Sequence, residues 1–279
     1  SRLDSARTLH ADGLPRRGSR RVLEMIVFAH VPKTAGTSIT GVLMRFLTSV
    51  GVPASQMLLY GVRIPYTNLE PLGQLPGEVR LLSGHFRGPH YEELLRIDPF
   101  IVASTRDPFE RFCSGLEHTQ RLLGSEEFYA KPEMLEKGGR LLNELSAARG
   151  DRPATRAALL RYREVEQRGS RRYLVHEDRF VAKARIESTD VDRLCQGLAD
   201  TTPQIPDLLA TLRSVNQQNI WPRQYFVTFS EPENEVIRSC FEECFEDEVA
   251  ITAAFRREIR SVFEPDLWKT FIDGLLRPA

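Results

Sequence analysis

The chain has 279 residues, enough for one large α/β domain with a substantial core or for two small domains. Its 38 Lys and Arg residues balance its 38 Asp and Glu residues, so the formal net charge is zero. No long-range field therefore draws it towards nucleic acid or an anionic membrane, and any anionic ligand must be held by a local patch. The sequence has no run of about 20 apolar residues, the length that spans a bilayer.

The polar, arginine-rich stretch over residues 1–22 predicts a flexible arm, and residues 23–279 are expected to form one domain. Of the four cysteines, Cys240 and Cys244 lie four residues apart among apolar side chains. This spacing is typical of a buried helix face and not of a disulfide pair or a zinc site. No Asn-x-Ser/Thr motif for glycosylation occurs. A cytoplasmic, soluble protein is therefore expected.

Three short apolar runs predict buried parallel strands over residues 23–32, 79–86 and 99–108. Between the first two, apolar residues at helical spacing over 39–50 predict an amphipathic helix. Residues 51–78 are rich in Pro and Gly and are expected to form a loop. Strands that alternate with helices predict an α/β protein with a P-loop-like three-layer fold, in which helices flank a central parallel sheet.

The remainder of the chain is predicted to be mostly helical. Residues 125–182 are highly charged and are expected to form an insertion of helices joined by loops. Residues 184–198 predict a short strand followed by a helix. Ser230 and Glu233 have the spacing of a capping box, which predicts the start of one long helix, and residues 264–276 predict a last helix.

A turn of small residues follows the first predicted strand and leads into the first predicted helix. Its members, after Pro32, are Lys33, Thr34, Ala35, Gly36, Thr37 and Ser38. Backbone N–H groups at such a turn bind anions together with the helix dipole, and the lysine and hydroxyls add further donors. In the ATP-binding version of this loop the lysine comes after the second glycine, whereas here it precedes the glycine. The alternative interpretation is an ordinary strand-to-helix turn with a surface lysine.

The third predicted strand leads into a second candidate anion site. A helix N-terminus with a capping box accounts for Asp107, Pro108 and Glu110. It does not account for Arg106 or Ser114. Arg106 follows the strand, where ligands bind in open α/β sheets, and both its guanidinium and the Ser114 hydroxyl can donate to a phosphate. The alternative is capping combined with a surface pair between Asp107 and Arg111.

His85 lies at the end of the second predicted strand, in the segment SGHFRGPH. Because the carboxyl ends of parallel strands meet at one edge of a sheet, Lys33, His85 and Arg106 are expected to converge there. A histidine at such a meeting point is a candidate general base. His90 is a competing candidate, but it lies past the following turn.

The segments HVPKTAGTSI, SGH and TRDPFERFCSG, in this order, resemble those of sulfotransferases that use 3′-phosphoadenosine 5′-phosphosulfate (PAPS). The resemblance is closest to carbohydrate sulfotransferases of the heparan sulfate 2-O-sulfotransferase type, in a bacterial-like form. It covers residues 26–48 and 80–118 and is thinner towards the C-terminus. It implies a transferase that moves a sulfuryl group in line from PAPS to an acceptor hydroxyl and releases 3′-phosphoadenosine 5′-phosphate (PAP).

The resemblance also implies the residue roles. Residues 34–38 cradle the 5′ side of PAPS, and Lys33 stabilises charge on the bridging oxygen. Arg106 and Ser114 hold the 3′-phosphate, and His85 deprotonates the acceptor. No metal ligand is implied. Two alternatives remain open: a P-loop nucleotide kinase or NTPase, and a non-catalytic nucleotide-binding module.

The acceptor is less defined than the donor. Only the resemblance favours a carbohydrate or glycoconjugate, with an anionic glycan as one option, and it places the acceptor side in the insertion over 125–182. It also implies an alternative to the cytoplasm, the Golgi lumen, after removal of an N-terminal anchor. The basic segment 152–172 has arginines that can contact an acidic glycan, but Glu164 and Glu166 interrupt it, so a solvated helix face is the alternative. Trp221 can stack on adenine or a sugar ring, or pack in the core.

Overall fold

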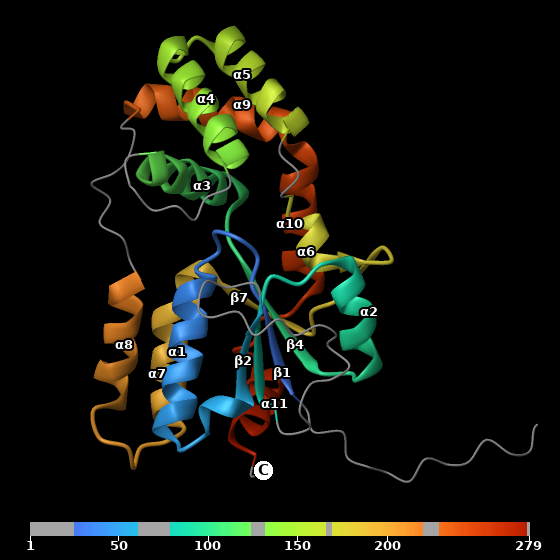
Figure 1. Cartoon of the computed structure of the whole chain (residues 1–279), viewed down its shortest axis with the longest axis vertical. Coiled ribbons are helices and arrows are strands. Elements are labelled where there is room, and N and C mark those ends of the chain that lie inside the picture. The colour runs from blue at the N-terminus through green and yellow to red at the C-terminus, as the bar shows by residue number, and fades with distance from the viewer. Residues whose placement is uncertain (1–24, 61–78, 124–131, 166–168, 220–228, 278–279) are drawn as a thin grey trace, which may run out of the picture.

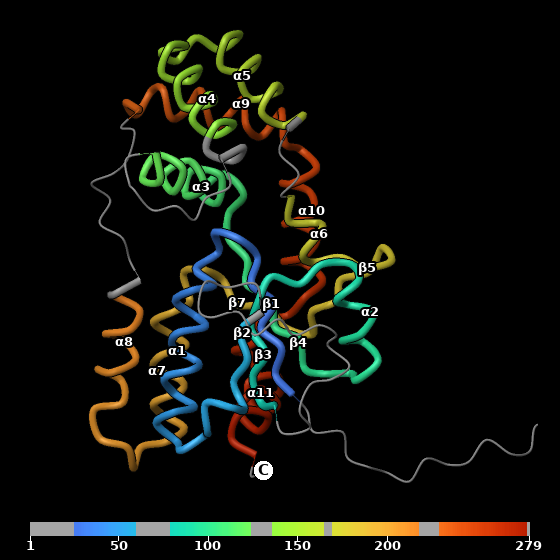
Figure 2. The backbone as a smooth tube through the Cα atoms, viewed as in Figure 1, coloured from blue at the N-terminus to red at the C-terminus, as the bar shows by residue number. Residues whose placement is uncertain are grey.

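The computed structural model describes residues 25–60, 79–123, 132–165, 169–219 and 229–277 (Figures 1 and 2). The predicted arm over 1–22 and Trp221 lie outside these ranges. The central sheet consists of β1 (Ile26–Ala29), β2 (Met57–Tyr60), β3 (Leu81–Gly84), β4 (Phe100–Thr105) and β7 (Ala184–Glu187). The α-helices that accompany it are α1 (Gly36–Ser49), α2 (Gly88–Arg96), α3 (Pro108–Leu123), α4 (Pro132–Ala148), α5 (Arg152–Val165), α6 (Arg171–Leu174), α7 (Val191–Asp200), α8 (Leu208–Asn219), α9 (Glu231–Cys244), α10 (Glu246–Glu258) and α11 (Pro265–Leu276).

All five strands of this sheet run parallel, in the order β2-β3-β1-β4-β7. The central strand β1 pairs with β3 on one side and β4 on the other. The chain therefore leaves β1 towards one edge of the sheet and later crosses to the other. Ligands of open α/β sheets bind at this kind of switch point, outside the carboxyl ends of the strands. The predicted α/β class, with helices flanking a parallel sheet, is confirmed.

Strand β2 and helix α2 were missed in the sequence, as were helix α8 and the two-stranded sheet over residues 175–180. Strand β2 lies in the stretch predicted to be a loop, after a 3₁₀ turn at Ala54–Gln56. It is a four-residue edge strand next to a Pro- and Gly-rich segment, so its apolar signal is short. Helix α2 lies between β3 and β4, where only a turn was predicted.

Every residue of the inner strands β1 and β4 is buried, because apolar side chains pack on both faces of the sheet. On one face the buried side chains of α1, α7, α8 and α11 pack against the sheet. On the other face the partners include α2, α6 and Phe255 of α10. Figure 1 shows α1, α7 and α8 on one side of the strands and α2 on the other.

A separate group of helices, α3, α4, α5 and α9, gathers above the sheet at the end where β4 runs into α3 (Figure 1). Its core contains Phe109, Phe241 and Phe245, and the last two rings stack at 4.7 Å. The Cys240 and Cys244 thiols are free and buried in the same cluster, as their spacing predicted, and burial raises the pKa of both.

The described part of the segment 125–182 contains helices α4, α5 and α6, and it also contains two short strands that the prediction of helices joined by loops did not include. A two-stranded antiparallel hairpin, β5 (Val175–His176) with β6 (Arg179–Phe180), follows these helices. The capping box at Ser230 and Glu233 is also present. The single long helix predicted after it is wrong, because the chain leaves helical geometry at Phe245 and divides into α9 and α10. Across the described ranges, no helix combines the length and apolar character needed to cross a membrane.

A buried ion pair ties the upper helices to the sheet. Arg111 of α3 donates to Glu248 of α10 at 2.7 Å, and the second Glu248 oxygen accepts the Ser170 backbone N–H at 2.7 Å. Since the Glu248 side chain is only 8% exposed, its removal leaves buried donors short of an acceptor.

We expect Glu248→Ala to lower the free energy of unfolding by about 3 kcal/mol, because breaking a buried pair leaves an uncompensated charge. Urea denaturation followed by circular dichroism measures this. Glu242→Ala removes the same side chain from an exposed position on α9 and should change stability by less than about 0.5 kcal/mol. Equal effects of the two substitutions would contradict the role of Glu248.

Candidate active site

The loop between β1 and α1 lies at the carboxyl end of the central strand. Lys33 and Ala35 both adopt left-handed backbone conformations, with φ of 67° and 58°, and Ala35 is the N-cap of α1. Such conformations in a tight turn direct successive N–H groups to one side and form anion-binding concavities. The first turn of α1 contains no acidic residue that would oppose an anion. The loop therefore has the backbone shape and electrostatics of an anion site.

The side chains of the predicted loop residues differ in exposure. Thr37 is exposed, Lys33 and Ala35 are half-buried, and the buried members are Thr34, Gly36 and Ser38. Of the loop's hydroxyl-bearing residues, Thr34 and Ser38 are therefore buried and Thr37 is exposed.

Thr34 braces the loop from within. Its hydroxyl donates to the Val31 carbonyl at 2.6 Å and lies 2.5 Å from the Ser104 hydroxyl of β4. A hydroxyl has one hydrogen, so Thr34 accepts from Ser104 and its side chain has no second proton for a ligand. A second hydroxyl pair, Thr40 of α1 with Ser83 of β3 at 2.7 Å, repeats this arrangement. The loop and helix are thereby tied to both strands that flank β1.

His85 follows β3 and is oriented by the end of β1. Its Nδ1 lies 2.7 Å from the backbone oxygen of His30. Because a carbonyl only accepts, Nδ1 carries a proton in this contact and the lone pair of neutral His85 is on Nε2. This is the tautomer that a general base needs.

Sequence reasoning missed His30, although it stands directly before the Val-Pro-Lys segment. Its ring is 7% exposed and stacks on the His85 ring, with 4.3 Å between ring centroids. Burial, and then electrostatic repulsion from His85 and Lys33, hold the pKa of His30 well below its usual value. His30 is therefore a neutral neighbour of His85.

The His30 ring also explains why a glycine begins α1. A Cβ atom at Gly36 would lie 1.7 Å from His30 Cδ2 and 2.1 Å from Nε2. Gly36 is thus required for close packing of helix against ring, independently of backbone flexibility. The same contact connects the loop to His85.

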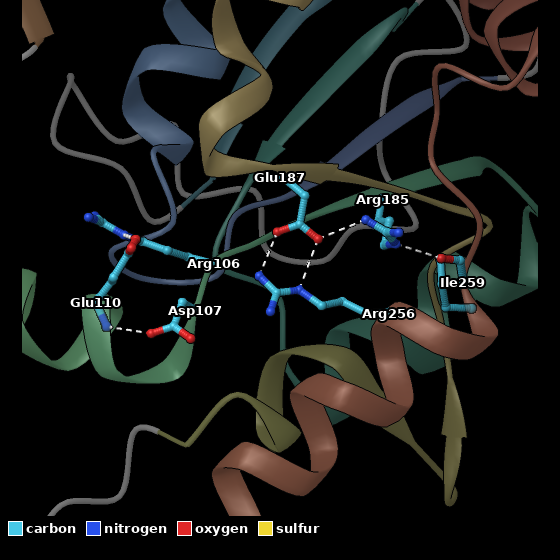
Figure 3. A network of polar contacts seen from close by, with 7 residues as sticks. All are labelled: Arg106, Asp107, Glu110, Arg185, Glu187, Arg256 and Ile259. Atoms are coloured by element: carbon cyan, nitrogen blue, oxygen red, sulfur yellow. Dashed lines mark hydrogen bonds and ion pairs between the residues drawn. The ribbon is translucent and has the colours of Figure 1, made fainter. Parts of the chain in front are cut away.

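Arg106 follows the last residue of β4, on the same edge of the sheet. Its Nε forms an exposed ion pair with Glu110 at 3.2 Å (Figure 3). Asp107 caps α3 as predicted, since its carboxylate accepts the Glu110 N–H at 3.0 Å. The Glu110 side chain, in contrast, pairs with Arg106. Ser114 is half-buried about two turns into α3.

Next to Arg106 is a second polar network, which the sequence analysis did not single out. Glu187, the last residue of β7, accepts from Arg256 at 3.0 and 2.8 Å and from Arg185 at 2.7 Å (Figure 3). The hydrogen bond to Glu187 raises the pKa of Arg256. This network attaches α10 to the carboxyl end of the sheet. The sequence signal that could have found it was Glu187, a charged residue at the end of a predicted strand.

An open cavity of about 500 Å³ lies at the start of α2, near His85. It is lined by Arg87, Gly88, Pro89, His90, Arg172 and Val175. The guanidinium carbons of Arg87 and Arg172 lie 6.0 and 5.9 Å from the centre of the Tyr173 ring. The same ring makes an edge contact with His85, at 6.2 Å between centroids. Tyr173 therefore links the cationic cavity to the candidate base.

His90 has a local structural function, because its Nδ1 accepts the Arg87 N–H at 3.1 Å at the start of α2. The described contacts connect the loop to His85 through Gly36 and His30. They connect the loop to β4, two residues before Arg106, through Thr34 and Ser104. Among the described residues, no hydrogen bond or ion pair is seen between Ser114 and this group.

No model of a known protein family, no curated protein and no solved structure matches this chain. Among the residues with described positions, no group of three or more His, Cys, Asp or Glu side chains is arranged to hold a metal ion.

We expect Gly36→Ala to lower the free energy of unfolding by about 1–3 kcal/mol, because the added methyl overlaps the His30 ring. In a His30→Ala background the same substitution should cost much less, since the ring is gone. Thermal unfolding of the four proteins of this double-mutant cycle measures the coupling.

Gly115→Ala is the matched control, because a Cβ atom there meets no atom within 4 Å and a helical Gly→Ala change is neutral or stabilising. An equal cost of Gly36→Ala in both backgrounds would contradict the contact.

Proposed function

We propose that the protein is a PAPS-dependent sulfotransferase. The observation that carries this proposal is the His85 hydrogen bond to the His30 carbonyl, which leaves Nε2 as the base at the edge where the loop with Lys33 lies. A base, a cation and an anion-binding turn at one sheet edge are the parts that sulfuryl transfer to a hydroxyl requires.

In this proposal the N–H groups of residues 33–38 hold the 5′ side of PAPS. Arg106 and the Ser114 hydroxyl hold the 3′-phosphate. To do so, Arg106 releases Glu110 and pairs with the phosphate instead. The pair with Glu110 is exposed and so is worth at most about 1 kcal/mol, which a charge-assisted contact to phosphate offsets.

The transfer step is a displacement at sulfur. The acceptor oxygen bonds to sulfur while the bond from sulfur to the 5′-phosphate oxygen breaks, and the hydroxyl proton passes to His85 Nε2. Lys33 stabilises the negative charge that develops on the departing oxygen. The products are the sulfated acceptor and PAP, and His85 later returns its proton to water.

The alternatives explain fewer of these features. A kinase or NTPase loop places its lysine after the glycine, whereas Lys33 precedes Gly36. A non-catalytic nucleotide-binding module has no use for a histidine held in the base tautomer. We therefore favour the transferase.

For the acceptor we propose a hydroxyl-bearing carbohydrate with an anionic group. Arg87 and Arg172 flank Tyr173 at the cavity beside His85, so a carboxylate or sulfate bound there leaves a neighbouring hydroxyl near the base. Guanidinium groups suit both anions because they donate two parallel hydrogen bonds.

The donor site is tested by calorimetric titration with PAP, AMP and ATP·Mg²⁺. We expect PAP to bind at least about tenfold more tightly than AMP, because Arg106 adds a charge-assisted contact to the 3′-phosphate. Arg106→Ala should weaken PAP binding by about 10–100-fold and leave AMP nearly unchanged. Arg45→Ala, an exposed arginine of α1, is the control. Preference for ATP·Mg²⁺, or indifference to the 3′-phosphate, would overturn the proposal.

The acceptor site is tested with a glucuronic acid-containing oligosaccharide and with neutral N-acetylglucosamine oligomers as substrates. The uronic acid acceptor should have a KM at least about tenfold lower, and the Arg87→Ala/Arg172→Ala double variant should remove this difference. Arg171→Ala is the control, because this exposed neighbour pairs with Asp178. Preference for the neutral oligomer would contradict the anionic acceptor and leave the donor proposal standing.

A further inference from the structure

His30 occupies the centre of the candidate site, yet the reaction described above assigns nothing to its side chain. Its backbone N–H donates to the Gly84 carbonyl at 2.7 Å, and its own carbonyl accepts from His85 Nδ1 at 2.7 Å. These bonds hold the end of β1 to two consecutive residues at the end of β3. The position of His30 therefore determines the position of His85.

The ring of His30 lies between the loop helix and the base. One contact is with Gly36, where no Cβ atom fits, and the other is the stack on His85, with planes inclined by 30°. A third ring, Phe28, lies parallel to His30 at 6.5 Å. Side chains in such packing have few alternative rotamers, so the His30 ring restricts the plane of the His85 ring.

The nitrogen chemistry of His30 points to a neutral ring. Its Nδ1 is buried and finds no hydrogen-bond partner among the described residues. Burial keeps the pKa of His30 well below its usual value. A neutral ring next to His85 does not oppose the positive charge that His85 gains when it takes the acceptor proton, and its aromatic face attracts that charge.

We propose that His30 is a positioning residue, whose carbonyl fixes the tautomer of His85 and whose ring fixes its orientation against the loop. This inference rests on the proposed function for its effect on rate. Its effect on His85 itself is independent of any substrate.

The first test compares His30→Ala with His30→Phe. Alanine removes the ring, whereas phenylalanine keeps an aromatic face and removes both nitrogens. We expect His30→Ala to lower kcat by about 10–100-fold, since small misplacements of a base have effects of this size, and to change the KM for PAPS by less than about threefold. His30→Phe should recover most of the lost kcat. A folded His30→Phe as slow as His30→Ala would assign chemistry to the nitrogens and overturn the proposal, as would full activity of His30→Ala.

The second test is long-range ¹H–¹⁵N NMR of the His85 imidazole without substrate. The wild type should show the Nδ1–H tautomer alone. His30→Ala keeps the carbonyl but removes the ring that holds His85 against it, so the His85 ring has room to turn away and should show averaging of the two tautomers. An unchanged His85 spectrum in His30→Ala would overturn the positioning function even if both variants were poorly active. If the wild type transfers no sulfuryl group but the spectrum changes as expected, the proposed function fails and the positioning function stands.

Discussion

The parallel pairing of β1 with both β3 and β4 is the constraint on which the site depends. It brings the ends of three strands to one edge, so that residues more than fifty positions apart in sequence come into contact. The Thr34–Ser104 and Thr40–Ser83 hydroxyl pairs then fix the loop and α1 to the neighbouring strands. Because both pairs are buried, they restrain the loop and α1, and such preorganisation lowers the ordering cost of binding a ligand.

The electrostatics of this edge are locally strong although the chain has no net charge. Cations from three places approach it: Lys33 after β1, Arg106 after β4 and Arg256 from α10. Glu110 and Glu187 neutralise two of them through the ion pairs in Figure 3. The two pairs differ in a useful way. Arg256 is held by both Glu187 oxygens and serves structure, whereas Arg106 has a single exposed contact with Glu110 and can exchange it for an anionic ligand at low cost.

Much of this arrangement could be predicted from the sequence. The apolar runs located β1, β3 and β4, and the rule that parallel strands end together placed Lys33, His85 and Arg106 at one edge. The capping residues Asp107 and Ser230 marked two helix starts. Apolar periodicity and capping residues act over a few neighbouring positions, so the sequence alone is enough to predict the elements they form.

The missed features depend on contacts between distant residues. In the sequence, His30 is indistinguishable from the end of an apolar strand. Only its stacking on His85 and its close packing against Gly36 identify it as part of the candidate site. The strand β2 is too short for a periodic signal. The break at Phe245 has no Pro or Gly to mark it, and the packing of its ring on Phe241 is visible only in the structure. Ser83 and Ser104 have no sequence signal at all, because their partners lie on another element.

A crystal structure of the protein with PAP bound tests the central claim most directly. The account predicts the 5′-phosphate within hydrogen-bond distance of the N–H groups of residues 33–38, the 3′-phosphate on Arg106, and Glu110 released from that arginine. PAP bound elsewhere, or an Arg106 still paired with Glu110 and out of contact with the 3′-phosphate, would contradict the assignment of this edge as the donor site.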